Sequence, residues 1–90
     1  MKRLLLVHGS VVGGRATWNG QLPLGERFEL EIVDRPGFPP NPLVDCVDFE
    51  RDADLVAGLL RRGDHVVGHS YGGVISLLAC ALRPELVRSL

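Results

Sequence analysis

The sequence is poor in the features that mark several classes of protein. It has no apolar run near the roughly 18 residues of a membrane-spanning helix. Its two cysteines, Cys46 and Cys80, stand in no spacing typical of a metal or redox site. The apolar run that follows Arg3 has only four residues, fewer than the roughly 7–15 of a secretory signal peptide. We therefore expect a protein of the reducing cytoplasm with no metal site and no membrane partner.

An excess of charge of one sign is also absent. Ten basic and eleven acidic side chains give a formal net charge of −1 at pH 7, and the basic residues form no stripe. Nucleic-acid-binding proteins usually concentrate positive charge, so no nucleic-acid partner is expected. Ninety residues, 46% of them hydrophobic, suit one small domain and leave no room for a second. The sequence does not indicate an oligomeric state.

Three short segments have the patterns of β-strands. Residues 4–7 form a continuous apolar run, which is typical of a strand buried on both faces. Residues 28–33 alternate apolar and acidic side chains, which predicts a half-buried strand at the edge of a sheet. Residues 65–68 form the third strand, and residues 86–90 resemble the start of one more.

The segments between these strands have helical or loop patterns. Residues 17–27 carry a weak helical pattern broken by glycine and proline, and the prolines in residues 36–42 predict a loop. Asp48 is a plausible N-cap of an amphipathic helix that Gly63 would end. Residues 71–82 are almost wholly apolar, which predicts a helix buried on most of its circumference. Strands that alternate with helices predict an α/β fold, in which helices cover both faces of a parallel sheet.

The chemistry is expected at the junction of the third strand and the apolar helix. Residues 68–72 read Gly-x-Ser-x-Gly, the pattern of a nucleophile elbow, in which a sharp turn projects Ser70 above the sheet. Only small residues fit two positions either side of such a turn, and Gly68 and Gly72 supply them. Gly73 would let the helix approach the strand closely. An ordinary glycine-rich turn is the alternative, which the strand before it and the helix after it disfavour.

A second motif closes the first strand. Residues 7–10 read Val-His-Gly-Ser and open a glycine-rich loop. The two motifs, Val-His-Gly-Ser first and Gly-x-Ser-x-Gly second, follow each other in the order found in a known family. This sequence therefore resembles the amino-terminal portion of the α/β-hydrolase fold family of serine hydrolases. The resemblance implies an oxyanion hole formed by the backbone N–H of Tyr71 and by that of Ser10 or Val11.

The same resemblance covers the end of the second strand. Asp34 and Gly37 match the Asp-x-x-Gly that the family carries there. The family often continues with Gly-x-Ser, whereas residues 38–41 read Phe-Pro-Pro-Asn in this sequence. The role of this loop is therefore left open.

The resemblance implies a serine hydrolase that acts on a small-molecule ester, thioester or similar acyl substrate through a covalent acyl-Ser70 intermediate. Such a mechanism needs no cofactor. In the family the acid and the histidine of the triad follow the nucleophile, so both are expected beyond Leu90. Residues 1–90 are then a partial domain, expected to be inactive alone. The alternative is a non-catalytic remnant or binding protein that retains the front half of the fold.

None of the three histidines is expected to be the base. His69 adjoins Ser70, but neighbouring side chains on a strand point to opposite faces. His8 is expected to brace the oxyanion loop, and His65 to face solvent where its strand begins. Asp34 is the one carboxylate near the carboxyl end of a strand, although the acid of the family follows a later strand.

Two nucleotide-binding motifs are nearly matched by the glycine-rich loop. A P-loop would need lysine and a hydroxyl residue where Arg15 and Ala16 stand. A dinucleotide-binding loop would need glycine where Val11 stands. Neither nucleotide function is expected.

Overall fold

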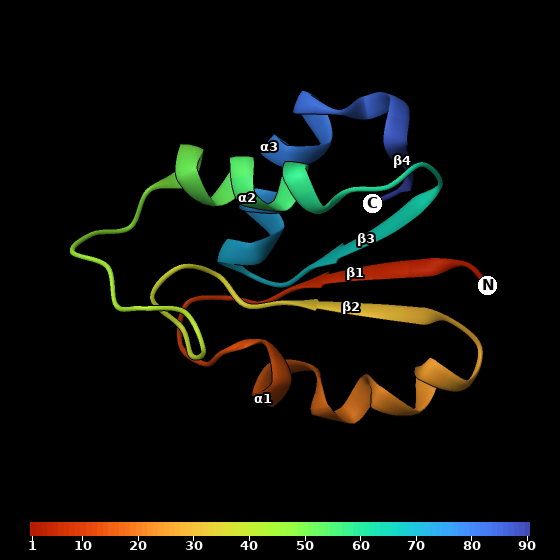
Figure 1. Ribbon diagram of the computed structural model, residues 1–90, viewed down its shortest axis with the longest axis horizontal. Helices are drawn as coiled ribbons and strands as arrows, with labels where there is room; N and C mark the ends of the chain where they lie inside the picture. The colour runs from red at the N-terminus through yellow and green to blue at the C-terminus, as the bar shows by residue number, and fades with distance from the viewer.

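The chain forms one parallel β-sheet between two layers of helices (Figure 1). The computed structural model describes residues 1–90. Its strands are ordered β2-β1-β3-β4, and every neighbouring pair is parallel. Their bounds are β1 (Arg3–Val7), β2 (Glu29–Val33), β3 (Asp64–Gly68) and β4 (Val87–Ser89). This is the α/β arrangement that the alternation of strands and helices predicts, with the second strand at an edge of the sheet.

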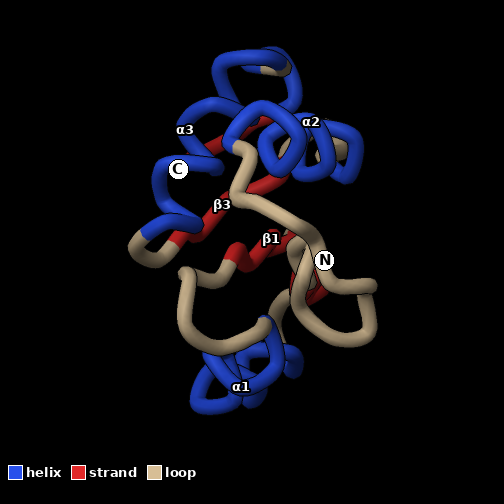
Figure 2. The backbone as a smooth tube through the Cα atoms, turned by 90° about the vertical axis from the view of Figure 1, so that its left-hand side faces the viewer, coloured by secondary structure: helices blue, strands red, loops and turns tan.

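Helices cover both faces of the sheet, as Figure 2 shows in the view along the layers. One face is covered by α1 (Gly14–Trp18) and the 3₁₀ helix η1 (Asn19–Glu26). The other face is covered by α2 (Phe49–Leu59) and α3 (Tyr71–Leu82), which pack against each other. A second 3₁₀ helix, η2 (Pro84–Leu86), precedes β4. None of these helices combines the length and the apolar composition needed to cross a bilayer.

The core lies between the sheet and the layer formed by α2 and α3. β1 runs between β2 and β3, and its residues Leu5 and Val7 are fully buried, which accounts for the continuous apolar run. The cluster of ten buried residues consists of Leu5, Val7, Val33, Ala53, Val56, Ala57, Leu60, Val66, Ile75 and Ala79. The α2 residues in this cluster recur at helical spacing, as the amphipathic pattern predicts.

A buried ion pair joins β1 to β3 at the end of the sheet where these strands start. Arg3 begins β1 and Asp64 begins β3, and Nη1 of Arg3 lies 2.9 Å from Oδ2 of Asp64. Arg3 also donates to the carbonyl of Leu59, and Asp64 accepts from the backbone N–H of Arg61. These bonds stabilise the charges that burial would otherwise leave uncompensated.

Two helix boundaries differ from the sequence prediction. The weak pattern over residues 17–27 is a short α-helix that begins earlier, at Gly14, and then continues as η1. α2 begins after the N-cap Asp48, whose side chain accepts from the N–H of Arg51, but it ends at Leu59. Gly63 lies beyond the helix, where its φ of +89° serves the turn into β3.

The prediction that residues 71–82 are buried on most of their circumference is wrong for this chain. The buried residues of α3 are Gly72, Ile75, Ser76 and Ala79. The exposed apolar residues of the same helix are Val74, Leu77, Leu78 and Leu82. The sheet, α2 and the short helix η2 contact α3 within these 90 residues, and one apolar side of the helix remains open to solvent.

Candidate active site

The loops that follow β1, β2 and β3 meet at one end of the sheet, on the left in Figure 1. Binding sites of parallel α/β sheets usually lie at this carboxyl end of the strands. The loop after β1 carries Gly9 and Ser10, the loop after β2 carries Arg35, and the turn after β3 carries Ser70. The motifs found in the sequence therefore lie at the same end of the molecule.

Ser70 occupies the sharp turn predicted between β3 and α3. Its φ of 56° and ψ of −125° make it the one non-glycine residue with a positive φ in the chain. A conformation of this kind costs a side-chain-bearing residue about 1–3 kcal/mol. The N–H of Gly72 donates to the carbonyl of His69 at 2.9 Å, and the N–H of Gly73 donates to that of Ser70 at 2.8 Å. These two bonds hold the turn closed.

Glycine is sterically required on both sides of this turn. A Cβ at Gly68 would lie 2.6 Å from the carbonyl oxygen of Gly72, and a Cβ at Gly72 would collide with the carbonyl oxygens of Val7 and His8. Gly73 does not have the steric role predicted for it, because a Cβ there would lie 3.6 Å from its nearest neighbour, an ordinary contact. The close approach of α3 to the sheet therefore depends on the two glycines of the Gly-x-Ser-x-Gly motif.

Ser70 shares a pocket with the loop that follows β1. The pocket has a volume of about 170 Å³ and is lined by Gly9, Ser10, Val11, Val12, Thr17, His69 and Ser70. A Cβ built on Gly9 would lie 3.2 Å from Cβ of Ser70, so the loop packs directly against the turn. Tyr71 is the first residue of α3, where backbone N–H groups have no acceptor within the helix. The fold thus brings together the serine and the three residues whose N–H groups the resemblance points to.

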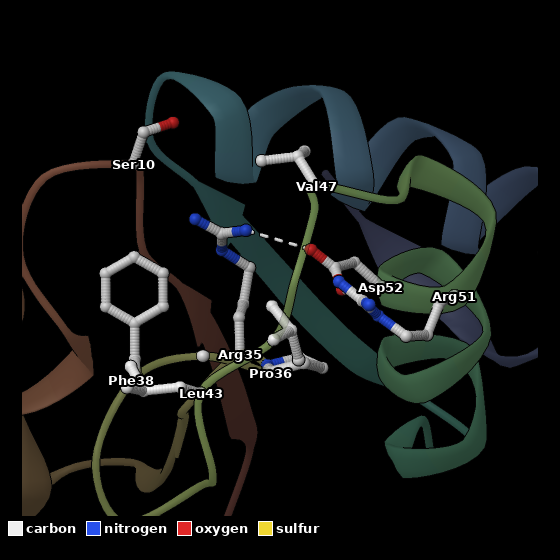
Figure 3. Close-up of a pocket in the computed structure, with 10 residues that line it drawn as sticks. Ser10, Arg35, Pro36, Phe38, Leu43, Val47, Arg51 and Asp52 are labelled. Carbon is white, nitrogen blue, oxygen red and sulfur yellow. Dashed lines mark hydrogen bonds and ion pairs between the residues drawn. The ribbon is translucent and has the colours of Figure 1, made fainter.

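A buried polar network around Arg35 holds the loop after β1, and it was not predicted from the sequence. Figure 3 shows its central ion pair, between Arg35 and Asp52. Arg35 is 3% exposed, and its Nη1 lies 2.9 Å from Oδ2 of Asp52 on α2. Its Nη2 donates to the carbonyl of Gly9 at 2.7 Å, and its Nε donates to the carbonyl of His8 at 3.3 Å. Asp52 also accepts from the Tyr71 hydroxyl at 3.3 Å. One signal was available, because Asp52 stands four residues before Val56, on the apolar face of α2.

His8 is fully buried and uses both ring nitrogens for hydrogen bonds. Nε2 accepts from the backbone N–H of Arg35 at 3.1 Å, so Nδ1 carries the proton and donates to the carbonyl of Gly9 at 2.8 Å. Burial, and secondarily the nearby Arg35 charge, lowers the pKa of His8 below its ordinary value of 6.5 although the Gly9 hydrogen bond opposes this. A neutral imidazole that makes two hydrogen bonds fits the expected role of His8 in bracing the loop.

The other polar candidates make no hydrogen bond to the side chain of Ser70. His69 is exposed and makes no hydrogen bond to Ser70. Nδ1 of His65 lies 2.6 Å from Oγ of Ser89, and this hydrogen bond connects β3 to β4. Asp34 directly follows β2, and Gly37, with a φ of +90°, lies in the turn that comes after it. No three His, Cys, Asp or Glu side chains lie together as ligands for a metal ion.

Known proteins resemble this chain in both sequence and architecture. The profile of a family described as the alpha/beta hydrolase family matches residues 4–90. A pimeloyl-[acyl-carrier protein] methyl ester esterase of Aeromonas hydrophila subsp. hydrophila is 36% identical, over 97% of this chain and 35% of the relative. The protein of the same name from Aeromonas salmonicida is 33% identical over the same shares. The chain therefore spans about a third of the length of these curated relatives.

A solved structure agrees with these sequence relatives. NosK from Streptomyces actuosus superposes with a TM-score of 0.84 and 26% identity, over 96% of this chain and 40% of NosK. The parallel sheet, the strained serine turn and the family profile over nearly every residue lead to one assignment. This chain belongs to the alpha/beta hydrolase family, of which it contains the amino-terminal part of the fold.

Proposed function

We propose that this chain is the front part of a serine hydrolase that cleaves an ester, thioester or similar acyl substrate, with Ser70 as the nucleophile. The observation that carries the proposal is the backbone of Ser70, which keeps a positive φ and presents an exposed side chain to the pocket beside Ser10. Strain of this kind persists where the surroundings enforce it, and it is common at catalytic residues. The nucleophile elbow is such a case.

The proposed reaction proceeds through a covalent intermediate. Oγ of Ser70 attacks the acyl carbonyl carbon while a histidine takes its proton. The carbonyl oxygen becomes an oxyanion that accepts hydrogen bonds from the N–H of Tyr71 and from that of Ser10 or Val11. The histidine returns the proton to the leaving group, and water then hydrolyses the acyl-Ser70 ester.

The proposal assigns the histidine and its carboxylate partner to the part of the complete domain that follows Leu90. No histidine within residues 1–90 hydrogen-bonds to Ser70. The triad order of this fold also puts both partners after the nucleophile. The short span of the chain relative to its relatives supports the same assignment.

A carboxylic ester is the favoured substrate class. The relatives that match this chain at 33–36% identity are named as methyl ester esterases. The small pocket beside Ser70 admits an acyl carbonyl group, although the walls that select the rest of a substrate belong to the complete domain.

The test uses the complete domain that begins with residues 1–90. Ser70→Ala should reduce hydrolysis of a short-chain nitrophenyl ester by several orders of magnitude, because loss of the triad nucleophile leaves only the oxyanion hole and binding. Ser89→Ala, which removes a serine at β4 far from the pocket, should keep the wild-type rate. A wild-type domain that binds acyl compounds without turnover would favour the non-catalytic alternative.

A further inference from the structure

The carbonyl oxygen of Gly9 is held by two buried donors. Nη2 of Arg35 donates to it at 2.7 Å, and Nδ1 of His8 donates to it at 2.8 Å. Both donors are buried, with Arg35 3% exposed and His8 fully enclosed. A carbonyl fixed by a guanidinium and an imidazole N–H has little freedom to rotate.

The orientation of this carbonyl determines the orientation of the next N–H. A trans peptide is planar, so the oxygen of Gly9 and the N–H of Ser10 point in opposite directions. The one cis peptide of the chain lies elsewhere, between Pro39 and Pro40. With its oxygen turned toward Arg35, the Gly9–Ser10 peptide directs its N–H away from the buried network, and no protein acceptor takes it up. Ser10 lines the pocket that contains Ser70.

Arg35 also contacts the residue that carries the second N–H. Its guanidinium carbon lies 4.2 Å from the centre of the Tyr71 ring, within cation–π distance. The Tyr71 hydroxyl donates to Asp52, the carboxylate that pairs with Arg35. One guanidinium therefore connects the loop after β1 to the first residue of α3.

We propose that Arg35 is a positioning residue for the oxyanion hole, which orients the Gly9–Ser10 peptide so that the N–H of Ser10, rather than that of Val11, faces the reacting carbonyl. This role rests on the proposed function of Ser70. The guanidinium does not touch the substrate and acts through the carbonyl of Gly9. Its positive charge also polarises this peptide, which strengthens the N–H of Ser10 as a donor.

The chain supplies a matched control for the loss of a buried arginine. The Arg3–Asp64 pair has the same N···O distance, 2.9 Å, and similar burial, but it lies where the strands begin, at the far end of the sheet. Arg3→Met and Arg35→Met both remove a buried guanidinium from a buried aspartate, although Asp52 keeps a second arginine contact, from Nε of Arg51 at 3.2 Å. Only Arg35→Met removes one of the two donors to the carbonyl of Gly9.

The experiment compares Arg35→Met, Arg35→Lys and Arg3→Met in the complete domain. Ser70→Ala, which lacks the proposed nucleophile, gives the rate without catalysis by Ser70. Active sites are counted by fluorophosphonate labelling, and thermal unfolding reports the folded fraction. We expect kcat per active site to fall at least about tenfold in both Arg35 variants, less than the 10²–10³-fold lost when an oxyanion donor is removed. KM should stay within about twofold, because this donor acts mainly in the transition state. Affinity for a trifluoromethyl ketone, which forms a tetrahedral adduct on the serine, should fall in parallel with kcat.

Arg35→Lys keeps the positive charge beside Asp52 but lacks the planar fork that reaches Asp52 and Gly9 together, so it should fold and still lose rate. Arg3→Met should lose stability yet keep its kcat per active site. The inference is overturned if both Arg35 variants keep kcat, if Arg3→Met loses as much, or if neither Arg35 variant folds while Arg3→Met does. Full activity of Ser70→Ala would instead overturn the proposed function itself.

Discussion

At the scale of single residues, the site combines one strained backbone with several buried polar groups. The strained turn at Ser70 could be predicted from sequence because the reason for it is local. Two glycines flank the serine, and each is required by contacts within the turn or with the adjacent strand. A motif of five residues therefore contains most of the steric information that forms the turn.

The Arg35–Asp52 pair could not be predicted in the same way. Its partners are 17 residues apart and are separated by a proline-rich loop whose path no local pattern determines. The sequence contains nine arginines, and nothing near Arg35 distinguishes it as one of the two that are buried. The position of Asp52 on the apolar face of α2 indicates a buried carboxylate, but it does not indicate which basic residue pairs with it.

His8 should give the complete domain a stability that depends on pH. Its pKa is lowered by burial in the folded state, so the unfolded chain binds a proton more readily. Stability should therefore fall as the pH drops below about 6.5, the ordinary value, and the loss should level off below the folded-state pKa. Denaturant unfolding between pH 5 and 8 measures this for wild type and His8→Asn. The variant should lack this part of the pH dependence, and identical curves would contradict the account.

At the scale of the elements, the sequence predicted which segments are strands and helices better than where they end. The continuous apolar run of β1 predicted a strand buried on both faces, and the alternating pattern of β2 predicted an edge strand; both predictions are confirmed. The end of α2 was misplaced because Gly63 serves the turn into β3. The apolar composition of α3 overstated its burial, since composition does not reveal which neighbours are present.

The contact between α3 and the sheet gives a prediction about two adjacent glycines. Gly72→Ala should destabilise the complete domain by about 3 kcal/mol, because its methyl group meets backbone carbonyls of β1 and the following loop that cannot move aside. Gly73→Ala should change stability by less than about 1 kcal/mol, since alanine favours the helix and its methyl group has room. Chemical denaturation compares the two variants. Equal losses would show that the helix does not approach the sheet as described.

At the scale of the whole molecule, the 90-residue chain leaves apolar surface uncovered. Leu77 is 62% exposed and Leu82 is 54% exposed on α3, and β4 is an edge strand with an open side. A groove of about 410 Å³ between α2 and α3 is lined partly by Leu78 and Leu82. Exposed apolar patches and unpaired parallel edges favour association between chains.

The isolated 90-residue chain should therefore associate in solution and should not hydrolyse esters. Sedimentation velocity over a range of concentrations measures the association, and a nitrophenyl ester assay measures activity. Leu77→Lys together with Leu82→Lys, both on the exposed side of α3, should reduce the association. A monomeric chain that unfolds cooperatively and turns over esters would contradict this prediction and would require a base among His8, His65 and His69.

The central claim is that Ser70 is the nucleophile, and the most direct measurement is the site of covalent labelling in the complete domain. A fluorophosphonate reacts with an activated serine, and digestion followed by mass spectrometry identifies the modified residue. The account predicts one label per domain, located on Ser70, and no label in Ser70→Ala. The other serines of this chain, Ser10, Ser76 and Ser89, should remain unmodified. A label on another residue, or undiminished labelling of Ser70→Ala, would contradict the account.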